Sequence, residues 1–126
     1  MSLETRLGDV RVTMGATTRL TATVRALGAE DLAMTLARVG IPAGLSVQAW
    51  QLDDLVKTGV IDFYETAPRD VYLYFRGLPK GVERTIHLDL VAEVPGTYEG
   101  PASAAFLYYA DEDQSWAPPL KVEIVP

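Results

Sequence analysis

Only one stretch of this 126-residue sequence has helical periodicity, and strand-like segments flank it on both sides. Within residues 40–59 the apolar residues that recur every three or four positions are Leu45, Ala49, Leu52, Leu55 and Val56. Ser46 suits the N-cap of a helix, Gly59 suits the position just after it, and Lys57 lies in the last turn. We therefore predict a helix over about residues 46–58 that crosses from one strand to another and packs its apolar stripe on the sheets.

The rest of the sequence consists of short segments that alternate apolar and polar residues, as half-buried β-strands do. In the longest of them, residues 84–94, the side chains of Ile86, Leu88, Leu90, Ala92 and Val94 are predicted to point inward. Roughly eight strands are expected, over residues 10–14, 20–27, 32–39, 60–65, 71–76, 84–94, 102–110 and 120–125. Such a series, punctuated by turns, predicts a mainly β fold: an antiparallel β-sandwich of roughly eight strands with one crossover α-helix.

The length suits one domain with one hydrophobic core. Residues 1–8 are expected to be a loose lead-in or a cloning remnant, and residues 9–126 a single β-sandwich domain. Residues 95–101 are interpreted as a rigid connection, and residues 111–115 as an acidic turn.

The composition excludes several classes of protein. The chain carries 11 basic and 17 acidic residues, a net charge of −6, whereas nucleic-acid-binding proteins need clustered Lys and Arg. It has no cysteine, which excludes disulfides, thiolate metal sites and cysteine nucleophiles. No apolar run approaches the roughly 20 residues that span a bilayer, and no signal peptide is visible. We expect a globular domain without a membrane span.

No group of residues in the sequence forms a recognisable catalytic centre, and we expect no enzymatic activity, cofactor or metal. The single histidine, His87, is predicted to point to solvent beside Asp89, without a nucleophile to activate. Asp111, Asp113 and Ser115 alternate as in a calcium loop, but the Gly and the distal Glu of such loops are missing. A solvated acidic turn is the preferred interpretation.

The aromatic residues have two interpretations. Tyr72 and Tyr74 lie on one strand face, and Tyr108, Tyr109 and Trp116 cluster near the chain end. They would either stack sugars or fill the rim of the sandwich core with their hydroxyls in water. We favour the second interpretation.

The predicted helix carries the other candidate surface. Trp50 lies about 200° around the helix from the centre of the apolar stripe. Together with Asp53, Asp54 and Lys57 it forms a candidate protein-contact surface on the outward face. The alternative, which we favour, is that Trp50 folds over onto a neighbouring loop or strand edge, or that the helix begins after Ser46.

Several segments, taken in order, resemble the C-terminal receptor-binding domain of the α-2-macroglobulin and complement (thioester protein) family. They are VGIPAGL at residues 39–45, LDDLV at 52–56, IDFYE at 61–65, VYLYF at 71–75, LDLVAEVPGTY at 88–98 and PASAA with a paired tyrosine at 101–109. Each segment alone is a weak signal, and their order and spacing make the resemblance specific. Because it lacks cysteine and has close turns, the sequence resembles a bacterial member of the family more than a vertebrate one.

The resemblance implies a receptor-binding-like sandwich with one strand-helix-strand unit, placed in a large extracellular or periplasmic protein. That parent would be a protease trap or a complement-like factor with a thioester in another domain. The implied partners are neighbouring domains of the parent chain, and a protein receptor or a protease complex.

Vertebrate members of the family that this sequence resembles carry two receptor-binding lysines, four residues apart at the start of the helix. The Ile41-Pro42 anchor aligns these lysines with Gly44 and Gln48, so neither position carries a lysine here. Only Lys57 is basic on the predicted helix, and we therefore do not expect endocytic receptor binding.

The leading hypothesis is a non-catalytic terminal domain of an α-macroglobulin-like protease-trapping or complement-like protein, which provides a protein–protein contact surface. The alternative is a carbohydrate- or protein-binding β-sandwich module attached to an enzyme or adhesin. An accessory domain of an enzyme is a third, more distant hypothesis.

Overall fold

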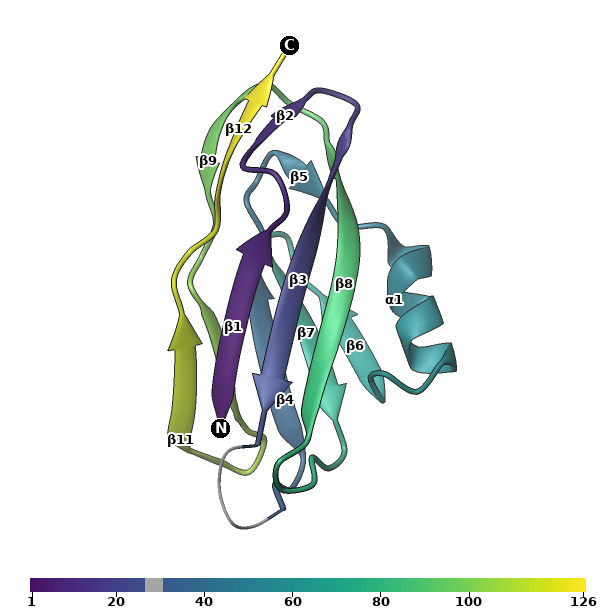
Figure 1. Cartoon of the computed structure of the whole chain (residues 1–126), viewed down its shortest axis with the longest axis vertical. Coiled ribbons are helices and arrows are strands. Elements are labelled where there is room, and N and C mark those ends of the chain that lie inside the picture. Colours follow the sequence, from purple (N-terminus) through teal and green to yellow (C-terminus); the bar gives the residue numbers. More distant parts are fainter. Residues whose placement is uncertain (27–30) are drawn as a thin grey trace.

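The computed structural model describes residues 1–26 and 31–126, except for the side chains of residues 110–113. Within these residues the chain forms twelve strands and one α-helix (Figure 1). The elements are β1 (Ser2–Leu7), β2 (Arg11–Thr13), β3 (Thr17–Arg25), β4 (Thr35–Gly40), β5 (Leu45–Ser46), α1 (Ala49–Lys57), β6 (Phe63–Thr66), β7 (Asp70–Phe75), β8 (Glu83–Ala92), β9 (Gly96–Glu99), β10 (Ser103–Leu107), β11 (Ala110–Ala117) and β12 (Lys121–Val125).

The strands form two main sheets and a small third one. A four-stranded sheet has the order β1-β3-β8-β5, and a five-stranded sheet has the order β11-β10-β4-β7-β6. A three-stranded sheet, β2-β12-β9, lies at the end of the molecule where the chain terminates (Figure 1). The strands within both main sheets pair antiparallel, and β2 pairs with β12 in parallel. The predicted mainly β sandwich with one helix is therefore confirmed.

The core lies between the two main sheets and is built from the inward half of each alternating strand. Leu20 and Val24 on β3, Leu88 on β8, and Leu73 and Phe75 on β7 are all buried. These side chains belong to one hydrophobic cluster. The inward pattern predicted for the longest strand is confirmed up to Ala92, where β8 ends. Val94 lies beyond the end of β8 and is exposed, contrary to the prediction.

The N-terminal residues are not a loose lead-in. All six residues of β1 pair antiparallel with β3, with Leu3 opposite Val24. Leu3 is buried and joins the core cluster, and its backbone N–H donates to the Ser115 side chain on β11 at 3.1 Å. The buried leucine and the pairing of every residue with β3 hold this segment in place. The segment is too short for its alternation of apolar and polar residues to predict a strand.

Two other segments expected to be irregular are strands. Residues 95–101, expected to be a rigid connection, contain β9, which pairs with β12. Residues 111–115, expected to be an acidic turn, lie within β11, which pairs with β10. In both cases pairing supplies the backbone hydrogen bonds and overrides the local preference for a turn, from β12 for β9 and from the preceding strand β10 for β11. The calcium-loop comparison concerned the side chains of Asp111 and Asp113, which lie outside the described residues.

The helix begins later than predicted, at Ala49. Ser46 belongs to β5 and pairs with Val91 of β8, so it is not the N-cap. Gln48 occupies that position and makes no side-chain capping bond.

The C-terminal end of the helix forms as predicted, with Gly59 just past the C-cap at φ 78°. Its N–H donates to the Val56 carbonyl at 3.1 Å, and the Val60 N–H donates to the Leu55 carbonyl at 3.0 Å. These two bonds form a Schellman motif, which satisfies carbonyls that the helix itself leaves unpaired.

The helix is the crossover element that connects β5 of one main sheet with β6 of the other, beside β8 and β6 (Figure 1). Leu52 is its only fully buried residue, whereas Ala49 and Val56 are exposed and Leu55 is half-buried. Leu45 is buried in β5 instead of on the helix. The predicted stripe is therefore narrower than expected, because a nine-residue helix at the side of the sandwich touches the sheets along one short line.

Candidate functional site

The helix is attached to the four-stranded sheet through the side chain of Gln51. The Gln51 Nε2 donates to the Asp89 carbonyl at 3.1 Å, and the Asp89 N–H donates to Gln51 Oε1 at 2.7 Å. The strand β5 pairs with β8 only at Ala92 and Val91. The Gln51 amide thus takes the place of a further strand residue along the edge of β8. Nothing in the sequence distinguished this glutamine from any other polar helix residue.

A second bond attaches the helix to the five-stranded sheet. The Tyr64 hydroxyl on β6 donates to Asp53 Oδ1 at 2.5 Å. Donation to this carboxylate, together with desolvation, raises the pKa of Tyr64. Asp53 was predicted to belong to an outward contact surface, and the structure shows that it is engaged within the domain itself.

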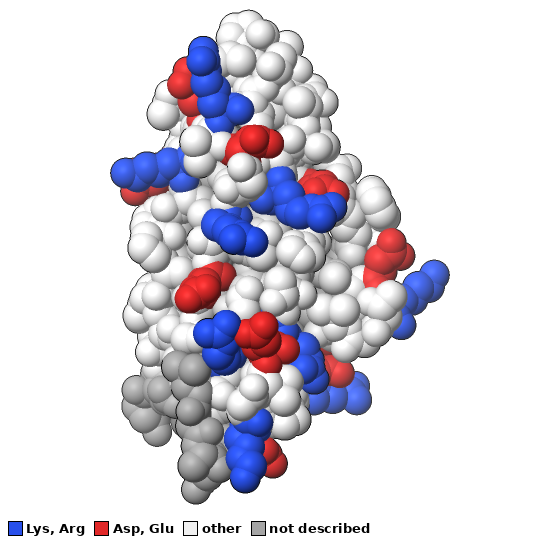
Figure 2. Space-filling model, in the orientation of Figure 1, with Lys and Arg blue, Asp and Glu red and all other residues white. Residues whose placement is uncertain are grey.

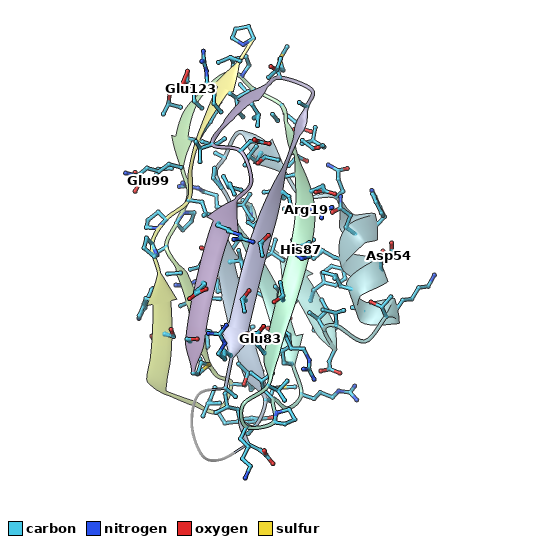
Figure 3. The ribbon with its side chains drawn as sticks, in the orientation of Figure 1. Arg19, Asp54, Glu83, His87, Glu99 and Glu123 are labelled. Carbon is cyan, nitrogen blue, oxygen red and sulfur yellow. The ribbon has the colours of Figure 1, made fainter. Side chains whose placement is uncertain are left out.

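The remaining predicted contact residues of the helix face away from the sheets. Trp50 is 63% exposed, so it is not a core residue. Asp54 and Lys57 are exposed on the same helix, and Figure 3 labels Asp54 on its outer side. The structure therefore brings Trp50, Asp54 and Lys57 to one exposed helix, which is held at two points by Gln51 and Asp53.

The positions aligned with the family's lysines lie elsewhere. Gly44 is buried in the turn before β5, and a Cβ built on it would overlap the ring of Tyr98 and the side chain of Ile124. Gln48 is half-buried and its Nε2 donates to the Ser46 hydroxyl at 3.3 Å. Gly44 therefore has no space for a lysine, and neither position lies within the helix.

The outer face of the four-stranded sheet is polar. Its exposed pairs include Thr23 with Thr85, and Thr21 with His87, whose Nδ1 lies 3.1 Å from the threonine hydroxyl. Two ion pairs flank them, one joining Arg19 to Asp89 at 2.9 Å and the other joining Arg25 to Glu83 at 2.6 Å. Figure 2 shows positive and negative side chains interspersed over this face.

The predicted solvent position of His87 is confirmed, since it is exposed on this polar face (Figure 3). The carboxylate nearest in sequence, Asp89, is engaged by Arg19, and this hydrogen bond lowers the pKa of Asp89. The arrangement is that of a surface histidine.

The outer face of the five-stranded sheet is aromatic. Neighbouring rings lie 5.5 Å apart between Phe63 and Tyr74, 6.1 Å between Tyr74 and Tyr108, and 4.8 Å between Tyr108 and Tyr109. Phe63 is 55% exposed and Tyr109 is 84% exposed. These rings do not fill the rim of the core, which was the favoured interpretation. They come from the consecutive strands β6 and β7 and from the turn between β10 and β11, which is distant from them in sequence.

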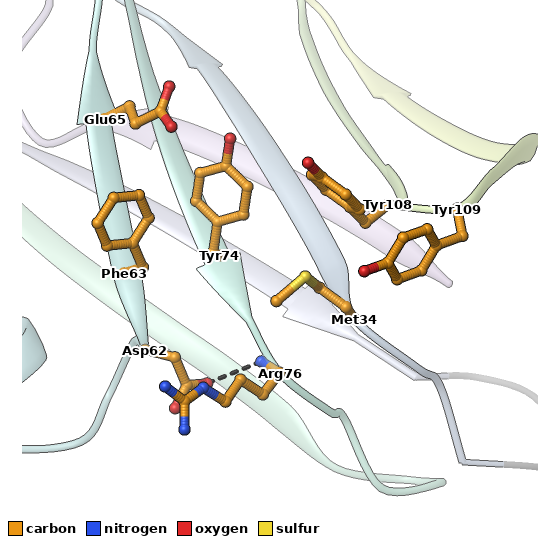
Figure 4. A pocket seen from close by; sticks show the side chains of 8 residues that line it. All are labelled: Met34, Asp62, Phe63, Glu65, Tyr74, Arg76, Tyr108 and Tyr109. Carbon is orange, nitrogen blue, oxygen red and sulfur yellow. Dashed lines mark hydrogen bonds between the residues drawn. The ribbon is translucent and has the colours of Figure 1, made fainter.

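The four rings line a shallow groove of about 420 Å³ (Figure 4). Its remaining lining residues are Met34, Asp62, Glu65 and Arg76. The Arg76 backbone N–H donates to Asp62 Oδ2 at 2.8 Å. Burial, and next the Glu65 carboxylate, raise the pKa of Tyr74.

Two residues of the predicted aromatic cluster lie outside the groove. Tyr72 is on the same face of β7 but does not line it. Trp116, on β11, has the Arg38 guanidinium 5.6 Å from its ring centroid. The structure therefore divides the predicted cluster into a groove and a separate Arg38–Trp116 pair.

The described residues include no group of three or more His, Cys, Asp or Glu side chains placed to hold a metal ion. In the same part of the chain, no helix is long and apolar enough to cross a membrane.

The sequence profile of the A-macroglobulin receptor binding domain matches residues 30–117. No curated protein sequence matches the chain at a significant level.

Solved structures with the same fold include *Escherichia coli* α-2-macroglobulin activated by porcine elastase, with a TM-score of 0.78 and 14% identity over 99% of this chain. Salmonella α-2-macroglobulin reacted with methylamine gives a TM-score of 0.74 and 15% identity over 100% of this chain. The chain spans 13% of the first protein and 9% of the second. A non-cellulosomal cohesin from the archaeon *Archaeoglobus fulgidus* gives a TM-score of 0.59 and 6% identity, over 100% of this chain and 93% of the cohesin. At these identities the likeness shows the fold.

Proposed function

Because the chain belongs to the A-macroglobulin receptor binding domain family, we propose that it is a non-catalytic terminal domain of an α-macroglobulin-like protease-trapping or complement-like protein. Its role in that protein is to present a protein–protein contact surface to neighbouring domains or to a receptor or protease complex. The parent protein is extracellular or periplasmic and carries its thioester in another domain, since this chain has no cysteine.

The observation that carries this proposal is an exposed tryptophan on a fixed helix. Trp50 is 63% exposed, and the helix beneath it is bonded to one main sheet through Gln51 and to the other through Asp53. A large aromatic side chain on a rigid support loses little conformational freedom on binding and is a common energetic centre of protein interfaces. Asp54 and Lys57 beside it supply charges for the rim.

This contact differs from recognition through a pair of lysines. Gly44 has no space for a side chain, and Gln48 is neutral and half-buried at the N-cap. The partner of this helix is therefore one that packs on Trp50, such as a neighbouring domain of the parent chain.

A Trp50→Ala variant of the parent protein tests the proposal. We expect the melting temperature of this domain to stay within about 2 °C, because the side chain is exposed. Docking to the neighbouring domains, measured with purified domains by calorimetry, should weaken. Trp116→Ala is the matched control, since Trp116 is similarly exposed and belongs to β11, which lies on the opposite side of the molecule from α1 (Figure 1). Unchanged docking in Trp50→Ala would contradict the proposed contact, and a parent gene that encodes a glycosidase or an adhesin would contradict the whole assignment.

The second candidate is a carbohydrate- or protein-binding module, which the aromatic face of the five-stranded sheet favours. A glycan array probed with the 126-residue chain and with Tyr72→Ala and Tyr74→Ala variants tests its carbohydrate form. Absence of binding to any glycan would discard that form.

A further inference from the structure

The shallow groove on the five-stranded sheet is lined by tilted aromatic rings. The planes of adjacent rings are inclined by 55° between Phe63 and Tyr74, by 54° between Tyr74 and Tyr108, and by 81° between Tyr108 and Tyr109. Because these tilted rings line a hollow, they form a trough instead of the flat aromatic platform on which a sugar stacks. The faces of aromatic rings carry negative potential, so a trough of this kind attracts a cation.

The charges of the groove add to this preference. Its lining holds two carboxylates, Asp62 and Glu65, against the single guanidinium of Arg76. Figure 4 shows Arg76 with Asp62 at one end, and the Glu65 carboxylate beside the hydroxyl of Tyr74 at the other. Glu65 takes part in none of the ion pairs found in the described part of the chain. The Glu65 end therefore offers a carboxylate and aromatic faces without a resident cation.

We propose that this groove binds a basic side chain, an arginine or a lysine, of a partner protein. The guanidinium or ammonium group lies over the ring of Tyr74 and pairs with Glu65, while its aliphatic stem packs on Met34 and the tyrosines of the β10–β11 turn. The same face already contains one such contact, between the Arg38 guanidinium and the Trp116 ring at 5.6 Å. The net charge of −6 also favours approach of a basic partner. This proposal does not depend on the helix surface.

The test is an NMR titration of the full 126-residue chain with a tetra-arginine peptide, and in parallel with a tetra-lysine peptide and a neutral trisaccharide. We expect a basic peptide to cause saturable shifts in the signals of Phe63, Tyr74 and Tyr108. Raising the salt concentration from about 0.01 M to about 1 M should weaken binding, because the Debye length falls from about 30 Å to about 3 Å.

Two variants locate the site. Glu65→Gln keeps the shape and removes the charge, and Tyr109→Ala removes a ring that is 84% exposed and so is not needed for folding. Each should weaken peptide binding about two- to fivefold. Trp50→Ala is the control and should bind as the unaltered chain does, which separates this site from the helix surface.

Three outcomes would overturn the proposal. The first is saturable binding of the trisaccharide at these rings without binding of either basic peptide, which would make the groove a carbohydrate site. The second is peptide binding that Glu65→Gln and Tyr109→Ala leave unchanged, because it would then occur elsewhere on the acidic surface. The third is the absence of saturable shifts with any of the probes.

Discussion

The two main sheets of this domain bury similar side chains inward and present opposite chemistry outward. The four-stranded sheet covers its outer face with threonines and with the ion pairs Arg19–Asp89 and Arg25–Glu83. The five-stranded sheet covers its own with aromatic rings, of which Phe63 and Tyr109 are more than half exposed. Both patterns satisfy the alternation that a half-buried strand requires, so the fold alone does not account for the difference.

The polar face has its charged partners within the domain, because each arginine named above pairs with a carboxylate on the adjacent strand. Exposed pairs of this kind contribute little stability and leave little to gain from a further partner. On the aromatic face, several apolar side chains remain in water beside a groove. Clusters of exposed apolar side chains mark interaction sites. The difference teaches that the core constrains only the inward residues of the strands, so the outward residues are free to carry either polar pairs or an apolar groove.

The largest effect on stability is expected at Leu52 of the helix, which packs beside both main sheets. Leu52→Ala should lower the free energy of unfolding by about 2–5 kcal/mol, because it removes a fully buried side chain from the core. Chemical denaturation measures this loss, with Leu55→Ala at a half-buried position as the comparison. A negligible loss would show that the helix does not hold the two sheets together.

A smaller effect is expected on the aromatic face. Tyr109→Ser should change the free energy of unfolding by no more than about 0.5 kcal/mol, since the side chain is 84% exposed. Thermal and chemical unfolding of the variant measure the change. A decrease of several kcal/mol in the free energy of unfolding would contradict the contrast between the two faces. It would show that the aromatic rings stabilise the fold and are not free for contact with a partner.

The smallest effect is expected from acid on the polar face. The hydrogen bond from Arg19 lowers the pKa of Asp89 in the folded state. The stability that this bond contributes is present above the unfolded pKa of aspartate, about 4, and is lost as the pH falls through the lower, folded value. Asp89→Asn should therefore flatten the decline of stability below about pH 4, as followed by unfolding at a series of pH values. An unchanged acid profile would show that the pair is screened by solvent.

Alternation predicted the strands whose inward residues form the core, such as Leu73 and Phe75 on β7 and Leu88 on β8. It could not predict β5 or β9, because these short strands exist only through pairing with β8 and β12. Helical periodicity predicted α1 but placed its start at Ser46. The local sequence does not distinguish a two-residue strand such as β5 from the first turn of a helix. The strand β1 was not predicted for the same reason, because its six residues form a strand by pairing with β3.

The candidate surfaces were predictable to different degrees. The periodicity of the apolar residues gives the angular position of Trp50 on the helix, and this position predicts that its side chain is exposed. The groove joins Met34, Phe63 and Tyr109, which adjoin different strands, so only the order of strands in the sheet brings them together. Gln51 and Asp53 could not be recognised, because their roles depend on the backbone of Asp89 and the hydroxyl of Tyr64.

The bidentate contact of Gln51 with β8 has a consequence for solubility. Past the two residues of β5, the edge of β8 would present free N–H and C=O groups, which are a template for strand addition by a second molecule. The glutamine amide occupies both backbone groups of Asp89, so the docked helix covers the edge of β8 at this residue. Detachment of the helix would therefore expose unpaired backbone groups of β8, and variants that weaken its docking should aggregate more readily than the unaltered chain.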